Sequence, residues 1–215
     1  MTTTDWYRHE RWDQEIALQF EARLARSRSS RGEYLRIQAY SLAATREAGS
    51  AGPAIELAKR YLILEPDGYA AAQMYATMAL AHETQGDRAA AVAAYRDATR
   101  LEQEKSGVRG YYYLDFAWFA ASHGLSDFYE EVLSAMAASR KEQDLMFPIN
   151  EYRYFASLAF IAADAGDSSA AARMAGNALL AASRTAGPFA RLPGAGLCGP
   201  TDDVHQERLE RLAGN

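Results

Sequence analysis

One stretch of this chain decides its fold: residues 69–101, which read YAAAQMYATMALAHETQGDRAAAVAAYRDATRL. Small residues stand where two helices would touch, namely Ala76 and Ala79 in the first half and Ala91, Ala94 and Ala98 in the second. Residues three and four apart share one face of a helix, so these alanines form two facing stripes. Gln85-Gly86-Asp87 interrupts the pattern between them. The stretch therefore predicts two antiparallel helices joined by a tight turn.

The composition favours an all-α protein that is large enough to bury a core. The chain has 215 residues, 49% of them hydrophobic, and only six are proline, the residue least compatible with a helix interior. Its net charge is -5 and its pI about 5.4, which argue against a general nucleic-acid or anionic-membrane binder. A single cysteine, Cys198, excludes an internal disulfide framework and a cysteine-based zinc site.

Targeting signals are not evident in the sequence. The first residues, MTTTDWYR, lack the basic patch and apolar run of a secretory signal. No stretch approaches the roughly 20 apolar residues of a membrane span. We expect a soluble cytoplasmic protein with no membrane partner.

Further helices are predicted on both sides of the central pair. The apolar spacing and the breaker residues give helices over 13–26, 33–48, 54–66, 111–123, 127–140, 151–165 and 168–183. Breaks are expected at 27–32, 49–52, 124–126 and 166–167. Trp6 and Trp12 should dock on the first helices, because two exposed tryptophans would be costly.

The C-terminal part changes character. Residues 185–200 contain four glycines and three prolines and cannot form a helix. Thr201-Asp202-Asp203 should then cap a last short helix over 204–212.

The helix over 54–66 and the central stretch resemble the tetratricopeptide repeat, a family of helix-turn-helix units of about 34 residues. The resemblance is carried by Ala54, Ala58, Tyr61, Leu62, Leu64 and Pro66, and then by Ala79, Gly86, Asp87, Ala91, Tyr95 and Ala98. This chain departs from the family pattern at His82, where an aromatic residue is usual, at Gln103, which replaces the closing proline, and at Tyr129, which replaces an alanine. The turn glycines Gly49, Gly86, Gly124 and Gly166 recur every 37 to 42 residues, a longer period than the family's.

The resemblance implies a right-handed α-solenoid of about four antiparallel helix pairs in a single domain, 1–215. The repeats would span 33–66, 67–105, 108–140 and 149–183, with an N-terminal helix before them. The loop and capping helix of 184–215 would cover the exposed core of the last repeat.

The resemblance also implies a function, which is non-catalytic binding of a protein or peptide in a concave groove lined by the first helix of each unit. Carried over by position, the groove-facing residues would be Gln73, Ala76, Leu80 and Glu83, then Tyr111, Leu114 and Trp118, then Arg153, Ala156, Phe160 and Asp164. Tyrosine, tryptophan and arginine are enriched at binding hot spots, so the aromatic helix over 111–123 is the strongest candidate. Two other interpretations of Trp118 stay open: it belongs to the core between repeats, or the loop over 188–200 covers it.

Two other functions are weighed against binding. The chain could be a structural or self-associating scaffold, with aromatic faces buried in a homodimer. A small-molecule-binding or enzymatic role is the least favoured, since the sequence offers no nucleophile–base pair and no metal-ligand spacing. We therefore predict no catalytic residue, no cofactor and no metal.

Four other features of the sequence are possible sites. Gly194-Ala195-Gly196-Leu197-Cys198-Gly199 matches G-x-G-x-x-G, but it lacks the preceding strand and following helix of a dinucleotide site and is read as a loop. The four histidines are scattered, and Cys198 has no local histidine. Arginines cluster around the first turn, at positions 23, 26, 28, 31 and 36; they form either a contact for an anion or acidic peptide, or a solvated turn, which is favoured.

Overall fold

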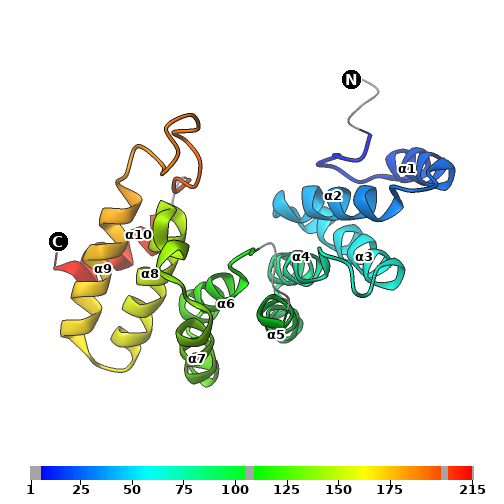
Figure 1. Ribbon diagram of the computed structural model, residues 1–215. Coiled ribbons are helices and arrows are strands. Elements are labelled where there is room, and N and C mark those ends of the chain that lie inside the picture. The colour runs from blue at the N-terminus through cyan, green and yellow to red at the C-terminus, as the bar shows by residue number, and fades with distance from the viewer. Residues whose placement is uncertain (1–5, 105–108, 200–202, 215) are drawn as a thin grey trace. The chain divides into compact units, whose positions relative to one another are not determined.

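The computed structural model describes residues 6–104, 109–199 and 203–214, and all regular structure within these ranges is helical (Figure 1). The prediction of an all-α chain is confirmed. The chain divides into two compact units, Met1–Tyr112 and Tyr113–Asn215. None of the described helices has the length and hydropathy needed to cross a bilayer.

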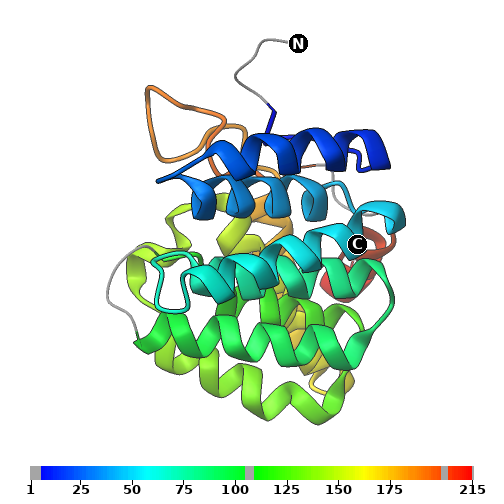
Figure 2. The ribbon, with the colours of Figure 1, turned by 90° about the vertical axis from the view of Figure 1, so that its right-hand side faces the viewer.

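The first unit is a set of helices packed in sequence order. Its helices are α1 Gln14–Arg26, α2 Arg31–Ala44, α3 Ala48–Leu64, α4 Ala71–Thr84 and α5 Arg88–Glu104. Helix α2 packs against α3, α4 packs against both α2 and α3, and α5 packs against α4. Helix α1 lies beside α2 in both views (Figures 1 and 2). Phe20 and Leu24 of α1 share a buried core with Leu35 of α2.

The α4–α5 pair has the turn and the packing that the sequence predicts. Gly86 adopts φ of 73°, a left-handed conformation that glycine reaches without the steric penalty of a side chain. The Asp87 carboxylate accepts a hydrogen bond from the Ala90 N–H at 3.0 Å and so caps α5. Helices α4 and α5 pack against each other as predicted. Of the five predicted alanines, Ala79, Ala91, Ala94 and Ala98 are buried, whereas Ala76 is half-buried.

The break between α2 and α3 lies earlier than predicted. Residues 49–52 are helical, and the interruption falls at Thr45 and Arg46, where Arg46 has φ of 57°. The Thr45 hydroxyl donates to the Leu42 carbonyl at 2.8 Å and thereby helps to end α2. The predicted break at 49–52 is wrong because Ser50 and Ala51 are buried against the core, while the flanking glycines face solvent in the first turns of α3.

The predicted docking of the N-terminal aromatic residues is confirmed. The Trp6 ring centroid lies 5.4 Å from that of Phe20 and 4.6 Å from that of Tyr34, and the Trp12 centroid lies 5.4 Å from Phe20. The fully buried Gln38 fixes the backbone of this segment, because its amide accepts from the His9 N–H at 2.9 Å and donates to the His9 carbonyl at 2.7 Å.

The second unit comprises shorter helices and two 3-10 turns. Its elements are α6 Tyr112–Ser122, a 3-10 turn at Ser126–Phe128, α7 Tyr129–Ser139, a second 3-10 turn at Glu142–Met146, α8 Pro148–Asp164, α9 Ser168–Ala182 and α10 Asp203–Ala213. The α8–α9 pair is joined at Gly166, which has φ of 80°, and Asp167 caps α9 by accepting from the Ala170 N–H at 2.9 Å. Figure 1 shows the two helices side by side.

A buried carboxylate, Asp144, ties together three elements of the second unit. The Tyr113 hydroxyl on α6 donates to Asp144 at 3.0 Å, and the Lys141 N–H donates to the same oxygen at 2.9 Å. The Asn150 side chain on α8 donates to the Asp144 carbonyl at 3.0 Å. No motif or helical spacing in the sequence distinguishes Asp144 from other acidic residues.

The predicted final helix is confirmed as α10, which packs against α8 and α9. Its Leu209 is fully buried. The predicted capping residues Thr201 and Asp202 lie outside the described residues. Residues 183–199 contain no helix, as the sequence predicts.

Candidate functional site

Helices α2 and α4 of the first unit lie side by side in a fixed parallel register. Three side-chain contacts set it: the Tyr69 hydroxyl with Glu33 at 2.8 Å, Arg36 with Gln73 at 2.9 Å, and Arg46 with Glu83 at 2.5 Å. The partners are 36, 37 and 37 residues apart, so the equivalent turns of the two helices face each other. We call the exposed side of this pair the α2–α4 face.

One end of the α2–α4 face is a charged network centred on Glu33. The Arg36 guanidinium donates twice to the Glu33 carboxylate, at 2.5 and 3.0 Å, a two-point geometry that arginine and carboxylate favour. The hydrogen bonds from Arg36 lower the pKa of Glu33 despite its partial burial, and the bond from Tyr69 acts in the same direction. In turn, the hydrogen bond to Glu33 raises the pKa of the Tyr69 hydroxyl. The charges of Glu33 and Arg36 therefore balance each other within the first unit.

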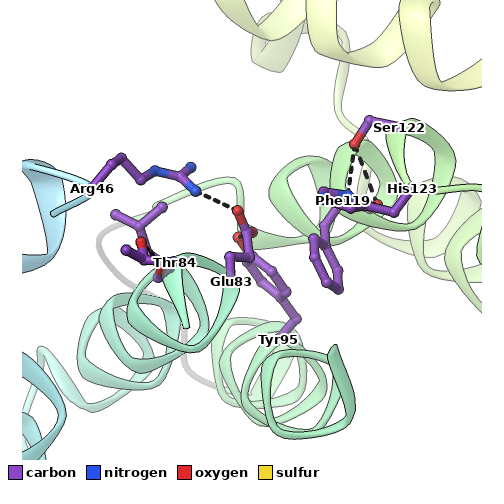
Figure 3. A network of polar contacts seen from close by, with 8 residues as sticks. Arg46, Glu83, Thr84, Tyr95, Phe119, Ser122 and His123 are labelled. Atoms are coloured by element: carbon purple, nitrogen blue, oxygen red, sulfur yellow. Dashed lines mark hydrogen bonds and ion pairs between the residues drawn. The ribbon is translucent and has the colours of Figure 1, made fainter. Parts of the chain in front are cut away.

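The other end is a second network, centred on Glu83 (Figure 3). The Glu83 carboxylate accepts from Arg46 and from the hydroxyl of Tyr95, and only 11% of its side chain is exposed. Tyr95 belongs to α5 and is buried, so this bond also joins α4 to α5. Beside it, the Thr84 hydroxyl donates to the Leu80 carbonyl at 3.0 Å in the last turn of α4.

The middle of the α2–α4 face is apolar. Ala76 and Leu80 of α4 are half-buried, and half of the Tyr40 side chain on α2 is exposed. The four positions predicted on α4, namely Gln73, Ala76, Leu80 and Glu83, are thus all partly exposed on one side. Gln73 already accepts a hydrogen bond from Arg36, and Glu83 accepts one from Arg46, just after α2. A ligand would therefore meet the remaining lone pairs of these two side chains.

In the second unit, side-chain contacts join α6 to α8 with a similar sequence offset. Asp115 of α6 forms an ion pair with Arg153 of α8, 38 residues away. The Trp118 ring on α6 lies 5.7 Å from Tyr152 and 5.9 Å from Phe160, both on α8. Leu114 and Phe160 are fully buried, whereas Trp118 is half-buried. Leu114 and Phe160 therefore lie beneath the surface that a ligand could touch.

Helix α10 occupies much of the face predicted for the second unit. The His205 ring lies 5.0 Å from Trp118, and the Arg208 guanidinium lies 4.2 Å from the Phe160 ring centroid. Arg208 also pairs with Asp164 at 2.9 Å, and the Tyr129 hydroxyl donates to the same carboxylate at 2.5 Å. Burial and the bond to Asp164 raise the pKa of the Tyr129 hydroxyl. Three predicted contact residues are thus engaged by the chain itself, through side chains that sequence reasoning missed.

The loop before α10 packs on the first turns of α8. The Ile149 N–H donates to the Gly196 carbonyl at 2.8 Å, and the ring centroids of Phe147 and Phe189 are 5.7 Å apart. Gly196 has φ of 73°, and a Cβ there would lie 2.3 Å from the Phe147 ring. Burial raises the pKa of the nearby Cys198 thiol. The glycine-rich motif is therefore a packed loop, and no strand precedes it in the described chain.

Tyr111 lies just before α6, not on its exposed side. Its φ is 60°, and its N–H donates to the Glu102 carboxylate at 2.7 Å. The Gly110 and Tyr112 N–H groups donate to the same side chain. Burial of Glu102 raises its pKa even though these amides favour the charged form. The structure thus shows a backbone role for this segment.

Groups suited to catalysis or metal binding do not gather in the described ranges, which contain no set of three or more histidine, cysteine or acidic side chains placed to hold a metal ion. His123 is at the end of α6, where its ring nitrogen lies 3.0 Å from the Phe119 carbonyl and 3.2 Å from the Ser122 hydroxyl (Figure 3). His82 is partly buried on α4, and burial lowers its pKa. The contacts of His123 are ones that a structural histidine makes.

Comparison of the chain with protein-family models, with curated proteins and with solved structures found no match.

Proposed function

We propose that this chain is a non-catalytic module that binds an extended peptide or a protein segment on the α2–α4 face, and that its helices form a tetratricopeptide-like α-solenoid. The repeated side-by-side register supports the solenoid, because the first helices of successive pairs are offset by 37 residues in one unit and 38 in the other. Such an offset is what a tandem helical repeat would produce.

The observation that carries the proposal is the layout of the α2–α4 face. Tyr40 lies one helical turn after Arg36, and Leu80 lies one turn before Glu83, so helical spacing places both apolar side chains between the two polar networks. An extended peptide has apolar side chains to bury and backbone groups that must stay hydrogen-bonded, so it suits an apolar strip with polar ends. Of the groove-facing residues predicted from the sequence, those on α4 are favoured as the binding site, because α10 contacts the equivalent residues of the second unit.

The test is selection of displayed peptides on the intact protein, followed by affinity measurement on two variants. Leu80→Arg should lower the affinity for a selected peptide at least tenfold, because it places a charge in the apolar middle of the α2–α4 face. Leu180→Arg is the matched control, since Leu180 lies on α9 with 63% of its surface exposed, and should leave affinity unchanged. Equal loss in both variants, or in neither, would refute the assignment of this face.

A self-associating scaffold is the second candidate, and a specific patch favours it. Ile63, Leu64 and Tyr69 flank the α3–α4 turn with 82%, 50% and 68% of their surfaces exposed. Exposed apolar clusters of this kind mark interfaces. Light scattering on the purified protein tests the idea: a dimer that Ile63→Asp converts to a monomer would support it, and a monomeric wild type would remove it. A small-molecule or enzymatic role gains no support, and a cytoplasmic location stays a prediction from the sequence.

A further inference from the structure

A shallow, wide-open hollow of about 390 Å³, called the cavity below, lies beside the end of α1, at a place separate from the α2–α4 face. Its lining consists of Trp6, Arg23, Arg26, Ser27 and Tyr34. The volume is at the low end of the roughly 300–1,000 Å³ found for ligand sites. Four of its five lining residues are tryptophan, tyrosine or arginine, the types enriched at binding hot spots.

The aromatic wall of the cavity is held in place by the core. The Trp6 ring contacts the buried Phe20 and lies 4.6 Å from Tyr34, and the Tyr7 ring packs against both Trp6 and Tyr34, at 5.5 and 4.8 Å. The wall is therefore formed before any ligand arrives, which lowers the entropic cost of binding.

The cationic side of the cavity is not neutralised by the described chain. Arg23 lies 5.8 Å from the Trp6 ring centroid, and Arg26 donates its Nε to the Ala22 carbonyl at 2.9 Å. Two acidic residues on α1 and α2 have other partners, because Glu21 pairs with Arg60 at 2.5 Å and Glu33 pairs with Arg36. Within the described ranges, neither Arg23 nor Arg26 forms an ion pair.

The structure also divides the arginine cluster seen in the sequence. Arg31 donates to the carbonyls of Leu24, Ala25 and Ser27 and so closes the end of α1. Arg36 is bound to Glu33 and Gln73. Arg23 and Arg26, three residues apart on one side of α1, are left facing the cavity, with Arg28 exposed outside it.

We infer that this cavity binds an acidic peptide, with carboxylates on Arg23 and Arg26 and an adjacent planar side chain on the Trp6–Tyr34 wall. Guanidinium groups pair with carboxylates through two parallel hydrogen bonds, and a ring stacks on the indole. This site does not depend on the α2–α4 face, so either proposed binding site can be refuted while the other stands.

The test uses a fluorescein-labelled peptide, Gly-Asp-Asp-Phe-Asp-Asp-Gly, with the asparagine-substituted peptide as its control. Measured by fluorescence polarisation, the intact protein should bind the acidic peptide at least tenfold more tightly than the asparagine-substituted peptide. The double variant Arg23→Gln/Arg26→Gln should lose that preference, while Arg28→Gln, which lies just after α1 and outside the cavity, should keep it. Leu80→Arg should also keep it, which separates this site from the α2–α4 face.

Three outcomes would overturn the inference. The first is equal affinity for the two peptides, and the second is an equal loss in the double variant and in Arg28→Gln. The third is competition by inorganic phosphate or by anionic phosphatidylserine vesicles at least as strong as competition by unlabelled peptide, since that would indicate a free anion or a membrane surface as the ligand.

Discussion

Replacing Leu209 by alanine should release α10 from the second unit without unfolding the rest. Leu209 is fully buried, and its truncation should cost about 3 kcal/mol, within the roughly 2–5 kcal/mol range for buried leucines. The other anchors of α10 are weaker. The Arg208–Asp164 pair is partly exposed and contributes roughly 0–1 kcal/mol, and the contact of Arg208 with Phe160 adds about 0.5–1 kcal/mol. An isolated helix of 11 residues is marginal in water, so α10 depends on these contacts.

Hydrogen–deuterium exchange measures the release directly. A loss of about 3 kcal/mol corresponds to a roughly 150-fold fall in the protection of α10 amides, at about 1.4 kcal/mol per factor of ten. Val204→Ala on the same helix is the control, because Val204 is 68% exposed, and should change protection by less than about twofold. Unchanged protection in Leu209→Ala, or equal loss of protection throughout α6, α8 and α10, would refute a locally anchored helix.

Three further predictions concern stability. Because burial lowers the pKa of His82, the unfolded chain binds more protons than the folded chain below the ordinary value of 6.5, so stability is lost as pH falls through that range. His82→Phe should flatten this dependence, measured by urea titrations at pH 7 and pH 5, and an unchanged pH dependence in this variant would contradict the assignment. Tyr95→Phe should lower the free energy of unfolding by about 1.5–3 kcal/mol, because it removes a buried hydrogen bond to the charged Glu83. Tyr40→Phe, at a half-exposed tyrosine, should lower it by less than about 0.5 kcal/mol, and equal effects of the two substitutions would contradict the role of Tyr95. Trp118→Ala should lower the unfolding free energy by roughly 2 kcal/mol or more, because the indole packs on Tyr152, Phe160 and His205; intact stability would instead favour a surface contact.

The sequence predicts the helices well where small residues and capping groups act locally. The turns at Gly86, Gly124 and Gly166 each have the positive φ that a glycine turn requires. The break between α2 and α3 was predicted at the wrong place because Arg46, not a glycine, takes the left-handed conformation there. Nothing in the local pattern of Thr45-Arg46-Glu47 predicts that conformation. Tertiary burial of Ser50 and Ala51 decides where α3 begins, and composition alone does not reveal burial.

The candidate site was predictable only for the part that depends on helical spacing. Positions 73, 76, 80 and 83 do share one exposed side of α4, as periodicity requires. Spacing does not show that a later helix lies over Trp118, because His205 and Arg208 are more than 80 residues away in sequence. The cavity beside Trp6 likewise depends on the docking of an irregular segment onto α1 and α2. The docking itself was foreseeable from the two tryptophans, but the cavity was not.

The position of α10 has a consequence for the order in which the chain is made. Residues 112–164, which carry Trp118 and Phe160, leave the ribosome before the helix that covers them. At about 5–20 residues per second, the 49 residues from Asp164 to Ala213 take roughly 2–10 s to synthesise. During that interval Trp118 and Phe160 lack the contacts that His205 and Arg208 make in the finished protein. A chaperone that recognises exposed aromatic side chains would have its opportunity then, and slower translation of residues 165–213 would lengthen it.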